Sequence, residues 1–102
     1  MIYNKLVRDR IPDIIHAKGG TCQTRILSDE EYAQKLDQKL GEELAEYLDS
    51  HDPEELADLL EVIYACAALQ KLTPDDLEVI RAQKAAKRGG FGDKILLIES
   101  NG

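Results

Sequence analysis

Apolar residues recur at helical spacing over most of the chain. Ser28 has the character of a helix N-cap, and Glu31 three residues later completes a capping box. The positions that follow repeat at i, i+3 and i+4, as on a helix with one buried face: Tyr32, Leu36, Leu40, Leu44, Tyr47 and Leu48. The pattern predicts a long helix from residue 28 to about Asp49.

Two further helices follow in the same way. One is predicted over residues 53–71, with Asp52 as N-cap and Pro53 in its first turn. Another is predicted over residues 74–88, where Thr73 caps its start and two glycines follow its end. Short turns join the three helices, so the first two are expected to fold back on each other as an antiparallel hairpin.

The ends of the chain carry weaker signals. A short helix is expected over residues 13–18, and the stretches 21–27 and 94–99, rich in apolar and β-branched residues, are expected as strands. The predicted fold class is all-α, in one domain over residues 1–102. It consists of a helix hairpin with a third long helix and one or two short strands at the periphery.

The charge is unevenly distributed. Residues 41–69 hold nine acidic residues and no Lys or Arg, whereas the whole chain has a net charge of −7 with 20 acidic and 13 basic residues. Surface helices usually interleave the two signs. A net-acidic chain without an aromatic-interleaved basic stripe argues against nucleic-acid binding. No apolar run of membrane-spanning length and no signal-peptide core occur, and two widely spaced cysteines fit a reducing cytoplasm.

The acidic residues fall in register around the hairpin turn. If the two helices fold back on each other, Glu43 lies opposite Asp58 and Glu46 lies opposite Glu55. Like charges at such spacing cost roughly 0.2–0.5 kcal/mol per pair even when exposed. A hard divalent cation gives a reason for the arrangement, and Mg²⁺ is preferred because carboxylates without His or Cys are its usual ligands. Mn²⁺ is the alternative metal.

Two basic segments flank the helices. Lys84, Lys87 and Arg88 end the last predicted helix before a glycine-rich segment that contains Phe91, and the first ten residues include Lys5, Arg8 and Arg10. Cations at a helix C-terminus favour its dipole, which is one interpretation. The other is a phosphate-binding role, with Phe91 available to stack on a base.

Taken together, these motifs resemble the MazG-like all-α nucleoside triphosphate pyrophosphatases, in particular the phosphoribosyl-ATP pyrophosphohydrolase-like subgroup. The resemblance extends over nearly the whole chain. It rests on Glu42-Glu43-x-x-Glu46, Glu55-x-x-Asp58, the N-terminal run Tyr3-Asn4-Lys5-Leu6-Val7-Arg8-Asp9-Arg10-Ile11-Pro12 and the later run Lys84-x-x-x-Arg88-Gly89-Gly90-Phe91. One departure is the short spacing of eight residues between Glu46 and Glu55.

The resemblance implies an enzyme that hydrolyses a nucleotide between its α- and β-phosphates, giving a monophosphate and pyrophosphate. Glu43, Glu46, Glu55 and Asp58 would bind Mg²⁺, with Glu42 as an additional or indirect ligand. Either Glu42 or Glu46 would act on the attacking water. The phosphates and base would be held by Lys5, Arg8, Lys84, Arg88 and Phe91. A homodimer or higher homo-oligomer is implied, and apolar residues on more than one face of the second long helix favour it independently.

Two other interpretations remain. The chain is then either a non-catalytic helical dimerisation or metal-binding module, or an acidic protein-binding hairpin that binds no divalent metal tightly.

Overall fold

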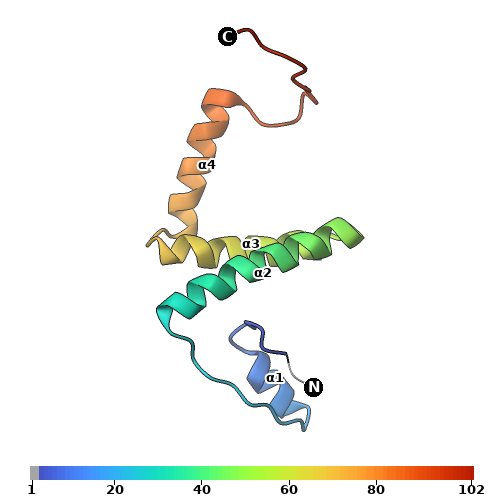
Figure 1. The fold of residues 1–102 in the computed structure, drawn as a ribbon, viewed down its shortest axis with the longest axis vertical. Helices are drawn as coiled ribbons and strands as arrows, with labels where there is room; N and C mark the ends of the chain where they lie inside the picture. Colours follow the sequence, from blue (N-terminus) through green and yellow to red (C-terminus); the bar gives the residue numbers. More distant parts are fainter. Residues whose placement is uncertain (1–2) are drawn as a thin grey trace.

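The computed structural model describes residues 3–102. Over this range it contains four helices and no strand (Figure 1). The helices are α1 (Ile11–Ala17), α2 (Asp29–Ser50), α3 (Pro53–Leu69) and α4 (Pro74–Arg88). Each begins and ends within two residues of its predicted bounds. The predicted all-α class is therefore confirmed.

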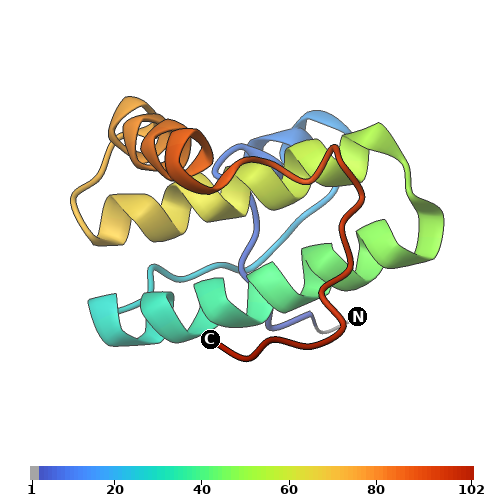
Figure 2. The ribbon, with the colours of Figure 1, turned by 90° about the horizontal axis from the view of Figure 1, so that it is seen from above.

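The hairpin of α2 and α3 is the central unit of the fold. The two helices lie side by side and antiparallel in both ribbon views (Figures 1 and 2). The Ser28–Glu31 capping box begins α2, and the Asp52 side chain accepts a hydrogen bond from the Glu54 amide at the start of α3. Between them His51 takes a left-handed conformation at φ 56°, which ends α2 and lets the chain reverse at once.

Helix α4 departs from the hairpin at a steep angle and meets α3 near the turn that joins them (Figure 1). The Thr73 side chain and Asp76 form the capping box that begins α4. Leu77 of α4 and Leu60 and Ile63 of α3 line an apolar hollow at this junction. The far end of α4, with its cations, consequently lies away from the hairpin.

The two predicted strands are wrong for this chain, because residues 21–27 and 94–99 form neither strand nor helix. They lie on opposite sides of the hairpin along the long axis of the molecule (Figure 1), so they do not pair with each other. A two-stranded ribbon is at best marginally stable without a third strand or a supporting helix. Both segments have a sequence preference for β-structure, but neither has a neighbouring strand with which to pair in the part of the chain described.

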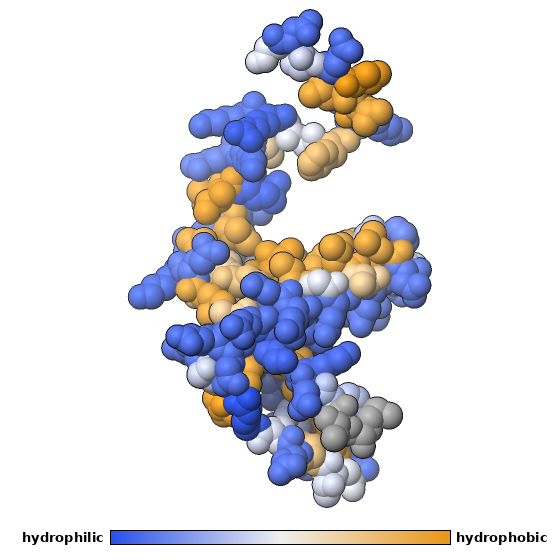
Figure 3. All heavy atoms as spheres, in the orientation of Figure 1, coloured by the Kyte–Doolittle hydropathy of each residue, from blue (hydrophilic) through white to orange (hydrophobic). Residues whose placement is uncertain are grey.

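The buried core is small. Leu36, Val62 and Ala67 are the buried apolar residues among those described, and Glu43 is buried with them. The radius of gyration is 18.0 Å, against about 13 Å for a compact chain of this length. Apolar surface is exposed on the edge of the hairpin facing α4 and on the C-terminal segment (Figure 3). None of the described helices combines the length and hydropathy that a membrane crossing requires.

Candidate metal centre

Three carboxylates from the two hairpin helices converge. Glu43 of α2 and Glu55 and Asp58 of α3 each present one oxygen such that the three oxygens lie within 4.8 Å of one another. The register predicted from the sequence thus brings these three together. Glu46, one turn after Glu43 on α2, is exposed and lies outside this group.

Two oxygens of the group lack hydrogen-bond partners. The Glu43 side chain is only 9% exposed, and both its Oε2 atom and that of Glu55 are buried without a partner in the part of the chain described. A buried polar atom left unpaired costs about 1–3 kcal/mol, and more when it belongs to a charged group. The fold therefore holds acceptor atoms that a cation between the helices would satisfy.

The protonation behaviour of the group reflects this crowding. Burial raises the pKa of Glu43, and the negative charges of Glu46 and Asp58 raise it further against the opposing effect of Lys39. Burial also raises the pKa of Glu55, as do the nearby negative charges of Glu46 and Asp58. Glu46 is therefore electrostatically part of the site although it lies at its edge.

Two cations within residues 3–102 contact the group. The Arg8 Nη2 atom lies 2.7 Å from Asp58 Oδ1, and Lys39 Nζ lies 3.4 Å from Glu43 Oε1 and 3.7 Å from Glu42 Oε2. Sequence analysis missed Lys39, which precedes the acidic block by two residues. Its spacing of three and four residues from the two glutamates is the signal that would have identified it.

The donor set fits a hard divalent cation. It consists of carboxylate oxygens only, which suits Mg²⁺ and Mn²⁺ better than Zn²⁺. The histidine nearest in sequence, His51, lies in the turn with its ring 5.0 Å from that of Tyr47. Glu43, Glu55 and Asp58 would hold such an ion, and Glu46 is the adjacent carboxylate that could approach it.

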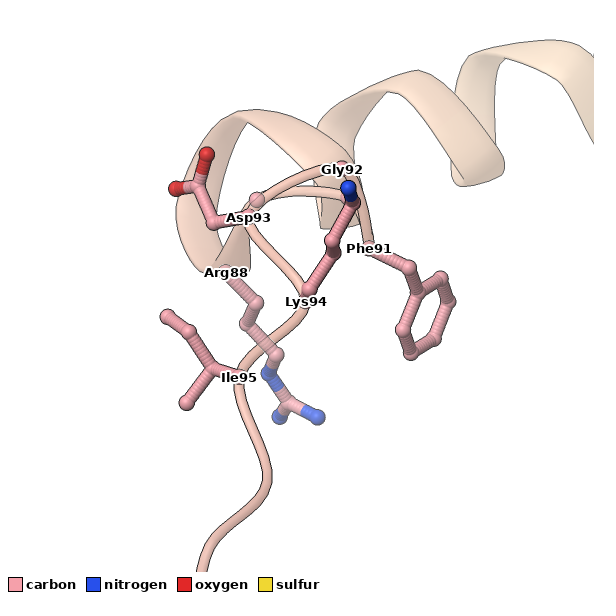
Figure 4. Close-up of a pocket in the computed structure, with 8 residues that line it drawn as sticks. Arg88, Phe91, Gly92, Asp93, Lys94 and Ile95 are labelled. Carbon is pink, nitrogen blue, oxygen red and sulfur yellow. The ribbon is translucent and has the colours of Figure 1, made fainter.

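The expected substrate-binding residues at the C-terminal side do not join this group. Lys84 and Arg88 are exposed on α4, and Phe91 is 99% exposed after it. Arg88, the last residue of α4, and Phe91 in the following loop line an open hollow of about 400 Å³. Their side chains point away from that of Asp93 (Figure 4). The far end of α4 stands well apart from the hairpin (Figure 1), so one chain does not bring its cations to the carboxylates.

Of the two expected N-terminal residues, Arg8 reaches the group and Lys5 is exposed without an ion-pair partner within residues 3–102.

Comparisons with known proteins give one short similarity. The chain is 60% identical over 40 residues to an uncharacterized protein of Mycolicibacterium smegmatis (strain ATCC 700084 / mc(2)155). This match covers 39% of the chain and 41% of the relative. No protein-family model and no solved structure matches the chain.

Proposed function

We propose that the chain is a Mg²⁺-dependent nucleotide pyrophosphohydrolase of MazG-like fold. It would cleave a nucleoside triphosphate or phosphoribosyl-ATP between the α- and β-phosphates, in a house-cleaning role. The observation that carries this proposal is the convergence of Glu43, Glu55 and Asp58 within 4.8 Å, with two buried oxygens unpaired. The sequence motifs described above supply the substrate class.

The chemistry needs a nucleophile, charge neutralisation and a leaving group. A bound Mg²⁺ would neutralise phosphate charge and lower the pKa of a coordinated water. Glu46, exposed at the edge of the group, would accept the proton of the attacking water, and Glu42 on the preceding turn is the alternative. The water oxygen forms a bond to the α-phosphorus, the bond from that phosphorus to the bridging oxygen breaks, and pyrophosphate leaves.

The phosphates require cations that lie near the carboxylates. Of the expected substrate-binding cations, Arg8 is the one that forms an ion pair with these carboxylates within residues 3–102, and its fork of N–H donors suits phosphate oxygens. Lys84, Arg88 and Phe91 would reach a nucleotide from a second copy of the chain. The proposed pocket therefore lies at or near an interface between copies.

The accessible surface supports a homodimer or higher homo-oligomer. The chain has a mass of 11.4 kDa and exposes 9286 Å². A folded monomer of this mass is expected to expose about 5,800 Å², so the excess is about 3,500 Å². Obligate interfaces bury roughly 1,000–2,500 Å² per chain. The excess is large enough for an extensive interface that covers the exposed apolar residues. We place the protein in the cytoplasm, which accords with two free cysteines.

The test is release of pyrophosphate from a panel of canonical and modified nucleoside triphosphates and phosphoribosyl-ATP, with Mg²⁺, with Mn²⁺ and with EDTA. We expect metal-dependent release from one substrate class. Asp58→Asn and Glu43→Gln should abolish it, whereas Glu61→Gln, an exposed acid one turn beyond Asp58, should retain it. Absence of turnover over the whole panel would refute the enzymatic proposal.

A second candidate function is a non-catalytic dimerisation or metal-binding module. The separation of the α4 cations from the carboxylates within one chain favours it (Figure 1). Such a module would bind Mn²⁺ and self-associate without hydrolysing any member of the panel. Calorimetry with Mn²⁺ on the inactive protein distinguishes it from an acidic protein-binding hairpin, which would not bind the metal tightly.

A further inference from the structure

The N-terminal arm, residues 3–10, reaches the acidic group through one side chain. Arg8 Nη2 and Asp58 Oδ1 are 2.7 Å apart, although the residues are 50 positions apart in sequence. Lys5 and Arg10 on the same arm are exposed and have no ion-pair partner within residues 3–102. Among the cations of the arm, Arg8 alone forms an ion pair with the acidic group within residues 3–102.

Arg8 contacts a carboxylate that a metal would need. Asp58 belongs to the three carboxylates whose oxygens lie within 4.8 Å of one another. A guanidinium cannot lose its charge at any ordinary pH, so it stays a cation competing for that carboxylate. A metal bound to the Asp58 carboxylate while Arg8 still contacts it would bring two positive centres close together, which is unfavourable.

The cations of the chain only partly neutralise the group. Arg8 contacts Asp58, and Lys39 contacts Glu43 through Oε1. The Oε2 atoms of Glu43 and Glu55 keep no hydrogen-bond partner within the described residues. A divalent ion carries twice the charge of Arg8 and can contact all three carboxylates at once. It therefore has an advantage that the single guanidinium lacks.

From these contacts we propose that Arg8 is a tethered counter-ion, which a divalent cation displaces from Asp58 and which then binds the phosphates held at that cation. The inference rests on the proposed function for the identity of the metal and the phosphates. Arg8, on its short arm, would have two successive partners. It would contact Asp58 before the metal binds and phosphate afterwards. Arg8 is thus a substrate-positioning residue whose release depends on the metal.

The solvent exposure of Arg8 and Asp58 limits how strongly their ion pair can oppose metal binding. The side chains of Arg8 and Asp58 are 56% and 40% exposed, and exposed ion pairs contribute at most about 1 kcal/mol, or about 5-fold in a binding constant. Removing Arg8 should therefore tighten Mn²⁺ binding by about 2- to 5-fold at low ionic strength, and less as salt is added. Once Mn²⁺ is bound, the same removal should weaken binding of inorganic pyrophosphate.

The experiment is calorimetric titration of the full chain with Mn²⁺, followed by titration of the Mn²⁺-loaded protein with inorganic pyrophosphate. Arg8→Ala is compared with Arg8→Lys, which keeps the charge, and with Arg10→Ala, which removes the same charge from the same arm. We expect Arg8→Ala to bind Mn²⁺ more tightly and pyrophosphate more weakly than the other two. Arg8→Lys should fall nearer to the unsubstituted protein, and it keeps the test valid if Arg8→Ala unfolds.

Each outcome has a distinct meaning. Mn²⁺ binding that Arg8→Ala leaves unchanged or weakens overturns the counter-ion role while the metal site stands. An equal gain with Arg10→Ala also overturns it, because general charge then explains the effect. If neither the unsubstituted protein nor Arg8→Ala binds Mn²⁺, the proposed metal site itself is wrong, and the role of Arg8 falls with it.

Discussion

Replacing Glu43 by Gln should stabilise the protein in the absence of metal. The carboxylate oxygens of Glu55 and Asp58 lie within 4.8 Å of that of Glu43, and at an effective dielectric of about 20 each pair of charges repels by about 3.5 kcal/mol. The opposing attraction of Lys39 Nζ at 3.4 Å is about 5 kcal/mol on the same basis. The two repulsions together exceed this attraction by about 2 kcal/mol, falling to about 0.5 kcal/mol at the dielectric of water.

The expected gain in the free energy of unfolding is therefore about 1 kcal/mol, or about 4–8 °C in Tm for a chain of this size. The assay is thermal unfolding followed by circular dichroism in EDTA, at one fixed protomer concentration because self-association affects Tm. Glu61→Gln is the control, since it removes the same charge from an exposed position of α3. It should change the free energy of unfolding by less than about 0.5 kcal/mol.

Adding Mg²⁺ should reverse the order of stability. A ligand present at ten times its Kd stabilises the state that binds it by about 1.4 kcal/mol. The unsubstituted protein should gain this amount, whereas Glu43→Gln should gain little because it has lost a ligand. The reasoning is refuted if Glu43→Gln lowers Tm in EDTA by several degrees while Glu61→Gln does not. Glu43 would then belong to a satisfied ionic network with Lys39 and not to an incomplete ligand set.

Three other predictions test the charge pattern, the capping and the assembly. The rise in Tm caused by Mg²⁺ should shrink as pH falls from about 8 to about 5. The reason is that the raised pKa values of Glu43 and Glu55 make the folded state bind protons above the ordinary carboxyl range, so protons compete with the metal. In EDTA the same proton uptake should raise stability as pH falls through that window, and a pH-independent Mg²⁺ effect in thermal melts would contradict this. Ser28→Ala should lower the free energy of unfolding in urea by about 1 kcal/mol, because it removes the hydroxyl that accepts a hydrogen bond from the Glu31 amide at 3.2 Å. A loss below about 0.3 kcal/mol would count against the cap. Leu97→Asp should lower the self-association constant by at least about 10-fold in sedimentation equilibrium, because a charge would replace an exposed apolar side chain of the proposed interface. An unchanged association constant would exclude this segment from the interface.

The helices and the convergence of Glu43, Glu55 and Asp58 could be predicted because both depend on local signals. Capping residues and apolar periodicity determine where α2 and α3 begin and end. The short turn, in which His51 adopts the left-handed conformation, then fixes which positions lie opposite each other. Because the turn is short, counting residues outward from it along both helices predicts which residues of α2 and α3 lie opposite each other with little error.

The contact of Arg8 with Asp58 could not be predicted in the same way. No single helix or short turn fixes the spacing of the two residues, because the irregular residues 20–28 separate the N-terminal arm and α1 from the hairpin. The sequence identified Arg8 as a cation of functional interest and left open what it contacts. The structure gives it an acidic partner, which changes its proposed role from a permanent phosphate ligand to a residue that exchanges partners.

The predicted strand at residues 94–99 was wrong for a reason that bears on the assembly. Its sequence has real β-character, since Ile95, Leu96, Leu97 and Ile98 are consecutive apolar residues, and they remain 76–87% exposed. Consecutive apolar residues in an extended segment indicate burial on both faces. Such a segment needs packing neighbours that residues 3–102 do not provide. Lys84, Lys87 and Arg88 at the end of α4 likewise form no ion pair within these residues, in contrast to Arg81, which pairs with Glu78. The proposed second copy of the chain would explain both observations, because it would cover the apolar segment and bring its carboxylates to those cations. The local signals predict the helices of one chain correctly, and the proposed assembly would account for the remaining signals.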